Sequence, residues 1–152
     1  MEWRKVIFIG ILAMAWTAIL SAAAFPSVAP VKPTIPHILA ILSYDPTFPT
    51  SHDILDGVES VFPAANNDVY VLYMNSKRQP GPEHTESFAT LVTWELTHSP
   101  RPDIILTFDD NAQRFVIDRR RQLFAGIPVV FAGVNDRDYV QSLQDQADLT
   151  GV

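Results

Sequence analysis

Four short apolar segments, separated by longer stretches of mixed polarity, restrict the fold of this chain more than any other feature. Each is a continuous run rich in aliphatic, β-branched or aromatic residues, which is the pattern of a strand buried on both faces. The predicted strands cover His37–Leu42, Val69–Met74, Asp103–Phe108 and Pro128–Phe131. Continuous rather than alternating hydrophobicity favours parallel strands, because helices cover both sides of a parallel sheet.

The stretches between these strands carry apolar residues at helical spacing. The predicted helices begin at Thr50 or Ser51, run from about Pro82 to Thr97, run from about Asn111 to Phe124, and cover Asp138 to Asp145. The first of them is expected to start with a capping box, Thr50 to Asp53. Strands that alternate with helices predict right-handed crossovers. We therefore predict an α/β fold with a doubly wound parallel sheet, Rossmann-like or flavodoxin-like, in the strand order 2-1-3-4.

An uncharged apolar segment, predicted to be a hydrophobic helix, precedes the sheet. It covers Val6–Ala24, follows a short basic start, and ends in three alanines that fit a signal-peptide cleavage site. Because its length approaches the roughly 20 residues that cross a bilayer as a helix, residues 1–24 are predicted to be a signal peptide or a membrane anchor. Prolines interrupt residues 25–36, which predicts an extended spacer. With either alternative, residues 37–152 are exported and are periplasmic or anchored facing outward.

Composition excludes several classes of function. The net charge of −6 does not fit a protein that neutralises nucleic-acid phosphates, and we interpret Arg119–Arg121 as a solvated helix face. The absence of cysteine removes thiol nucleophiles and zinc–thiolate sites. The sequence has no glycine-rich phosphate loop and no G-x-S-x-G elbow. We therefore predict a protein without catalytic residues, a resident metal or a cofactor.

Polar residues follow each predicted strand, at the edge where an open parallel sheet binds its ligands. In the strand order 2-1-3-4 the crevice opens between the first and third strands. The polar residues that follow these two strands should therefore face each other. The predicted ligand-binding residues are Ser43, Tyr44, Asp45, Arg78, Asp109, Asp110, Asn111, Gly133 and Asn135.

Some of these residues also fit other roles. Asp109 or Asp110 fits the N-cap of the third helix, and Asn135 with Asp136 fits a turn. Asp45 and the two adjacent acids also carry enough oxygen atoms to hold a divalent cation. A small Mg²⁺-dependent phosphotransfer domain is therefore an alternative to a ligand-binding protein.

Several stretches of the chain resemble one known family. They are ILSYDPTFP, DILDGV, YVLYMNSKRQPGPEH, PDIILTFDDNAQRFVIDRRRQLFAGIPVVFAGVND and the final LTGV. From about His37 to Val152 the chain is similar to the ABC-transporter substrate-binding-protein-like family, which has the type I periplasmic-binding-protein fold. Its members often form the extracytoplasmic sensor region of histidine kinases and diguanylate cyclases. Thr50 and Asn75 depart from the residues common in the family, an aromatic residue and an aspartate.

The resemblance implies a two-lobed domain that closes on a small ligand, with this chain as its N-terminal lobe. The second lobe and any downstream kinase or cyclase domain would lie beyond residue 152. The implied function is an extracytoplasmic ligand-binding sensor without catalysis of its own, and the alternative is the solute-binding component of an ABC transporter. We expect a small polar solute, with Tyr44 as an apolar wall and the acids and Asn111 as hydrogen-bond partners. Arg78 is expected to balance the acids or to meet an anionic group of the ligand.

Overall fold

The computed structural model describes residues 34–143 and 146–152. The predicted signal peptide or anchor, residues 1–24, and residues 25–33 of the predicted spacer lie outside this part of the chain. None of the helices within the described ranges has the length and apolar character needed to cross a membrane.

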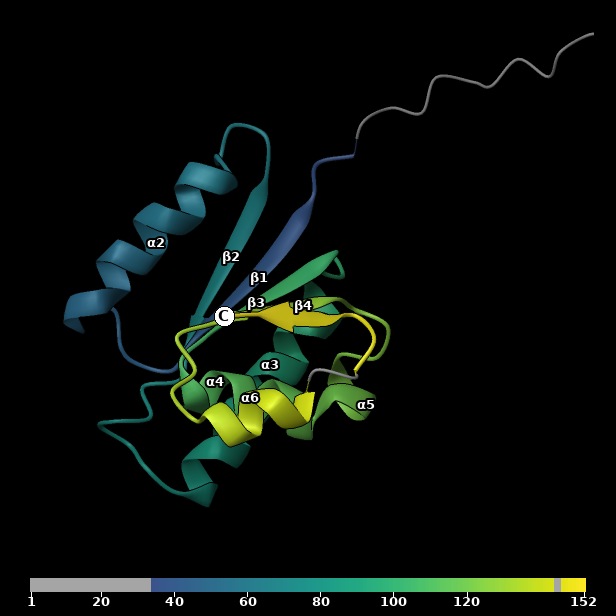
Figure 1. Ribbon diagram of the computed structural model, residues 1–152. Coiled ribbons are helices and arrows are strands. Elements are labelled where there is room, and N and C mark those ends of the chain that lie inside the picture. Colours follow the sequence, from purple (N-terminus) through teal and green to yellow (C-terminus); the bar gives the residue numbers. More distant parts are fainter. Residues whose placement is uncertain (1–33, 144–145) are drawn as a thin grey trace, which may run out of the picture. The chain divides into compact units, whose positions relative to one another are not determined.

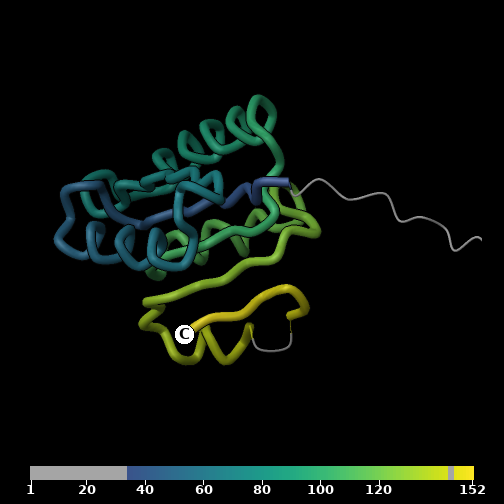
Figure 2. The backbone as a smooth tube through the Cα atoms, turned by 90° about the horizontal axis from the view of Figure 1, so that it is seen from above, coloured from purple at the N-terminus to yellow at the C-terminus, as the bar shows by residue number. Residues whose placement is uncertain are grey.

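The described residues form a five-stranded sheet in which every neighbouring pair of strands is parallel. Its order is β2-β1-β3-β4-β5 (Figure 1). The strands are β1 (His37–Leu42), β2 (Asp68–Tyr73), β3 (Ile104–Phe108), β4 (Val129–Ala132) and β5 (Leu149–Gly151). The predicted order of the first four strands is confirmed. The fifth was not predicted, because three residues are too short for a pattern; it pairs with β4 at the edge opposite β2 (Figure 2).

Helices lie on both faces of the sheet. They are α2 (Pro49–Val61), α3 (Pro82–His98), α4 (Asp110–Asp118), α5 (Arg120–Leu123) and α6 (Arg137–Leu143). Among the helices of the described residues, α2 alone lies on one face, whereas α3, α4 and α6 lie on the other (Figure 1). The right-handed crossover rule explains this division. From β1 the chain crosses the sheet in one direction to reach β2, and every later connection crosses it in the opposite direction. In the sheet, the connections therefore diverge between the neighbouring strands β1 and β3.

Alternate side chains of β1 enter two separate cores. Leu39 and Ile41 pack with the core of the α3 and α4 face, whereas Ile38 and Ala40 pack with the core beside α2. All four are at most 2% exposed. Burial on both sides explains why this strand is apolar without interruption.

The α2 face of the sheet is only partly covered. A helix is about 10 Å wide and strands lie about 4.8 Å apart, so one helix cannot cover five strands. Of the α2-facing side chains of β3 and β4, Phe108 and Val130 therefore remain half-buried. They line an open apolar groove of about 440 Å³ beside α2.

The predicted capping box of the first helix is wrong. The helix begins one residue earlier, with Phe48 as the N-cap and Pro49 in the first turn, and no side chain caps it. Proline favours this position because its fixed φ suits a helix and its missing N–H needs no partner there. Instead of capping, the Ser51 hydroxyl faces inward and donates to the Asp45 carbonyl oxygen at 2.9 Å.

The interpretation of Arg119–Arg121 as a solvated helix face is also wrong for two of the three residues. The predicted helix from Asn111 to Phe124 is divided into α4 and α5 at Arg119. The Arg119 side chain is only 15% exposed and its guanidinium lies 4.8 Å from the centre of the Phe115 ring. Arg120 donates to the backbone carbonyl oxygens of residues 147 and 148. Only Arg121 is exposed.

Candidate functional site

The carboxyl ends of β1 and β3 are joined by the Ser43 side chain. Its hydroxyl donates to the Phe108 carbonyl oxygen at 2.9 Å and accepts from the Ala112 N–H at 2.8 Å. Ser43 is 1% exposed. Ser43 therefore lies at the edge of the crevice, as predicted, but both hydrogen bonds of its hydroxyl are made with the backbone. Ser43 holds the first turn of α4 against the end of β1.

A short chain of hydrogen bonds extends this link to the loop after β2. The Ser76 hydroxyl donates to the Ser43 carbonyl oxygen at 2.7 Å, and the Asn111 side-chain amide donates to the Ser76 hydroxyl at 2.8 Å. Three strand exits are thus tied together. Ser76 was not predicted as a site residue, since a serine in an exposed loop carries no distinguishing signal in the sequence.

Asp109 is the N-cap of α4, in agreement with one of its two predicted roles. Its carboxylate accepts from the Asp110 N–H, whereas the N–H that a cap commonly binds, that of Ala112, is taken by Ser43. The Asp109 backbone has φ 74° and ψ 167°, a region that is occupied almost only by glycine. Asp109 is therefore held in a strained conformation by its surroundings.

Gly133, after β4, also has a positive φ, 74°, and a side chain here would approach the Asp109 N–H at 3.8 Å. The Asp109 N–H itself donates to the Ala132 carbonyl oxygen at 2.9 Å. Because 3.8 Å is an ordinary contact distance, the positive φ rather than a lack of space favours glycine at this position. Gly133 therefore lies at this edge, as predicted, and its role there is to adopt the backbone conformation that the loop needs.

The second acid of the pair, Asp110, is turned toward the loop after β4. Its carboxylate accepts from the Asn135 N–H at 3.2 Å and from the Asn135 side-chain amide at 3.1 Å. Burial raises the pKa of Asp110, but hydrogen bonds from Asn135 and Asp136 and the nearby Arg114 outweigh it, so the pKa lies below its ordinary value. Asp110 and Asn135 therefore stabilise each other, and the site edge continues to β4.

Tyr44 and Phe48, in the loop after β1, form an aromatic pair. Their ring centroids are 4.2 Å apart at an interplanar angle of 48°. Burial is the main cause that raises the pKa of the Tyr44 hydroxyl to about 12, and the neighbouring carboxylates of Asp109 and Asp110 add to it. Of the residues after β1 that were predicted to face the acids after β3, Tyr44 therefore lies near them.

Asp45 is turned away from this contact. Its carboxylate accepts from the Thr47 N–H at 2.9 Å and from the Thr47 hydroxyl, and it lies 3.2 Å from Arg78 Nε. The pKa of Asp45 is lowered, chiefly by the Thr47 hydroxyl, and further by the Thr47 N–H and Arg78. Arg78 balances this acid, in accordance with the expectation for it.

The three carboxylates do not form a metal site. Asp45 is directed to Arg78 and Thr47, and Asp110 to Asn135. Across residues 34–143 and 146–152, no three histidine or acidic side chains converge as metal ligands.

Three further residues at this edge were not among the predicted ligand-binding residues: Phe48, Lys77 and Asn75. The Lys77 ammonium lies 4.4 Å from the centre of the Tyr44 ring and 4.2 Å from that of Phe48. Asn75 has φ 55°, which asparagine tolerates better than most residues. Its side-chain oxygen is buried without a hydrogen-bond partner in the described part of the chain. Phe48 was interpreted only as loop packing for Tyr44.

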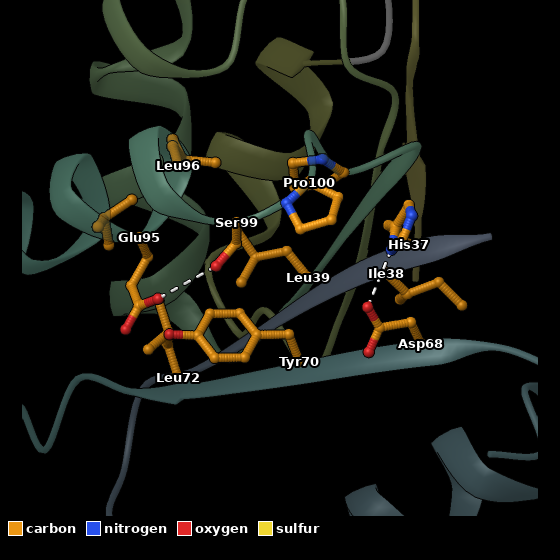
Figure 3. A pocket seen from close by; sticks show the side chains of 12 residues that line it. His37, Ile38, Leu39, Asp68, Tyr70, Leu72, Glu95, Leu96, Ser99 and Pro100 are labelled. Carbon is orange, nitrogen blue, oxygen red and sulfur yellow. Dashed lines mark hydrogen bonds and ion pairs between the residues drawn. The ribbon is translucent and has the colours of Figure 1, made fainter. Parts of the chain in front are cut away.

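One cavity lies at the carboxyl edge of the sheet and another lies at the amino edge. The first, about 250 Å³, lies beside the site between the β2 exit, the start of α3 and α4, and Ser76 and Asn111 are among its lining residues. The second, about 240 Å³, lies at the amino ends of β1 and β2 under the last turns of α3 (Figure 3). No sequence feature predicted it.

The cavity at the amino ends has apolar walls and a polar pair. Figure 3 shows the Tyr70 ring reaching toward Glu95, with the ion pair of His37 and Asp68 at the other end. Burial and the Glu95 carboxylate raise the pKa of Tyr70. We place the functional site at the carboxyl ends rather than here, because open parallel sheets bind ligands where the direction of the connections changes.

Comparison of the chain with protein-family models, with curated proteins and with solved structures found no match. The family resemblance in the sequence therefore stays a prediction, and so does the set of ligand-binding residues.

Proposed function

We propose that this chain is the N-terminal lobe of an exported, ligand-binding sensor domain of the type I periplasmic-binding-protein kind, without catalysis of its own. The observation that carries the proposal is the link that Ser43 makes between the β1 and β3 exits, which brings Tyr44 to the same edge as the acids Asp109 and Asp110. These two strands flank the point at which the sheet connections change direction. Small ligands of doubly wound folds bind at this point.

The residues at this edge have complementary roles in the proposed site. Tyr44 supplies an apolar wall, and the strained Asp109 supplies a carboxylate at the start of α4. Asn111 contributes a side-chain amide, whereas Asp110 and Asn135 mainly fix the neighbouring loop. Strain of this kind is found preferentially at ligand sites, where the rest of the fold enforces it.

One lobe offers only half of a closing cleft. A ligand on this surface would meet few groups and would leave much of its own area in water, whereas typical ligand sites bury most of the ligand. We therefore expect weak binding by this chain, with a dissociation constant in the millimolar range or about 4 kcal/mol of binding free energy.

Titration of the full chain in maltoside micelles tests the proposal. Amide NMR spectra are recorded with pools of amino acids, sugars, carboxylates and amines, and shifts are expected at Tyr44, Asp109 and Asn111. Tyr44→Ala should abolish them. The matched control is Tyr70→Phe in the cavity at the opposite edge, which should leave them unchanged.

Two results would contradict the proposal. Micromolar binding by this chain alone would contradict the interpretation that it forms only half of the cleft. Amide shifts confined to the Tyr70 cavity would show that the ligand binds at the opposite edge of the sheet. The downstream coding sequence separates sensor from transporter. A second lobe followed by a membrane span and a kinase or cyclase domain supports the sensor, whereas a stop after the second lobe supports the ABC-transporter component.

A further inference from the structure

We infer that the site at the carboxyl edge takes a ligand with a positively charged amine, and that the Lys77 ammonium occupies the place of that amine when no ligand is bound. This inference rests on the proposed function, since it names the ligand class of the same site. Three neighbouring features support it: the aromatic pair Tyr44 and Phe48, the Lys77 ammonium over their rings, and the Asp109 carboxylate, which has no cationic partner in the described ranges.

The aromatic pair already binds a cation. Tyr44 and Phe48 present their rings to the Lys77 ammonium at 4.4 and 4.2 Å from the ring centres. Both distances lie well within the roughly 6 Å over which a ring face attracts a cation. Among residues 34–143 and 146–152, Lys77 forms no ion pair with a carboxylate. The two ring faces are therefore the principal partners of its charge.

The charges around the pair favour a cation over an anion. Asp45 is balanced by Arg78, and Asp110 receives several hydrogen bonds and lies near Arg114. Asp109, whose carboxylate adjoins the Tyr44 hydroxyl, has no cationic side chain in ion-pair distance in the described ranges. A ligand ammonium at the aromatic pair would take the place of the Lys77 charge beside these acids.

The lysine is well suited to leave when a ligand arrives. Lys77 is exposed, and its side chain rotates about four bonds, so the ammonium can move into water without displacing the backbone. A cation–π contact at an exposed site changes an equilibrium constant only about two- to fivefold. Lys77 therefore competes with a ligand but does not exclude it.

Choline and 3,3-dimethyl-1-butanol form a suitable pair of probes, because they share their shape and differ in charge. Each is titrated into the full chain in maltoside micelles, and amide shifts are followed at Tyr44, Phe48, Lys77 and Asp109. Choline should shift these signals at millimolar concentration, whereas the neutral alcohol should not. Lys77→Met, which keeps the length of the chain but removes its charge, should strengthen choline binding about two- to fivefold.

Two further variants complete the test. Arg121→Met removes an exposed cation distant from the site and should leave choline binding unchanged. Asp109→Asn keeps the shape of the cap, so its melting temperature can be compared directly, and it should weaken choline binding severalfold. Equal binding in Lys77→Met and in the unaltered chain would overturn the role of the lysine.

The inference and the proposed function fail in different ways. If neutral or anionic solutes shift the signals of Tyr44 and Asp109 but choline does not, the cationic ligand class is wrong and the binding site stands. If solutes of no class shift these signals, the proposed function fails together with the inference.

Discussion

The Ser43 hydroxyl accepts a 2.8 Å hydrogen bond from the Ala112 N–H, across 69 positions of the sequence. A residue at the end of one strand thereby caps the helix that follows another. The same hydroxyl donates to the Phe108 carbonyl oxygen. This one buried group fixes the distance between the two strand exits that form the candidate site.

Ser43→Ala should therefore destabilise the protein by about 1–3 kcal/mol, because it leaves a buried N–H without a partner. Ser60→Ala is the matched control, since the Ser60 hydroxyl is exposed and bonds only within α2. Thermal unfolding of the full chain, followed by circular dichroism, measures both. An equal, small effect of the two substitutions would show that the link does not stabilise the fold.

Asp109→Gly should stabilise the fold while weakening ligand binding. Glycine occupies the observed φ and ψ without strain, which releases about 1–3 kcal/mol, and a glycine N-cap loses only a few tenths. Asn75→Gly is the comparison, and its gain should be smaller because asparagine tolerates φ 55°. A lower melting temperature for Asp109→Gly would contradict the proposed strain.

Asp110→Asn should lower the melting temperature at pH 7 and flatten its dependence on acid pH. The folded state lowers the pKa of Asp110, so the ionised form stabilises the fold above the ordinary pKa. This contribution is lost as pH falls through the lowered pKa, from about pH 4 downward. Melting temperatures measured from about pH 2 to about pH 7 give the comparison.

The control for this series is Asp56→Asn on the exposed face of α2, which should leave the melting temperature at pH 7 nearly unchanged. An unaltered acid dependence in Asp110→Asn would mean that the contacts with Asn135 and Asp136 do not stabilise the ionised carboxylate. The loop after β4 would then depend on other interactions.

Arg119→Ala should destabilise the protein by about 1 kcal/mol, mainly through loss of packing on Phe115. The ion pair with Glu86 contributes little, because the Glu86 side chain is 72% exposed. Glu86→Gln and Arg121→Ala should therefore both have small effects. If Glu86→Gln matched Arg119→Ala, the ion pair rather than the packing would be responsible.

Thr107 and Gln113 should show strong coupling. Their side chains meet in the core, where the Thr107 hydroxyl donates to Gln113 Oε1 and the Gln113 Nε2 has no partner in the part of the chain described. Thr107→Val alone should cost about 1–3 kcal/mol, since it removes the partner of a buried amide. The double variant with Gln113→Met should be closer to the unaltered chain than the sum of the single effects, as a double-mutant cycle measures.

The secondary structure could be predicted where burial on both faces imposes an uninterrupted apolar run. The boundaries of β1 agree with the prediction, and those of β2 to β4 differ by one residue. The start of α2 was missed because Pro49 outweighs the capping-box pattern. The interruption at Arg119 was missed because continuous helical spacing does not reveal a local change of backbone angle.

The sequence by itself determined an α/β fold with a parallel sheet, because continuous strand hydrophobicity and alternation with helices leave little choice. The order 2-1-3-4 was the doubly wound order expected for such a sheet, and the structure has it. The sequence also placed polar residues at the carboxyl edge. Only the tertiary structure decided what each of them does. Ser43 became a cap, Asp109 a strained acid and Lys77 the cation of an aromatic pair. Each role depends on a partner far along the chain, and local patterns carry no information about such partners.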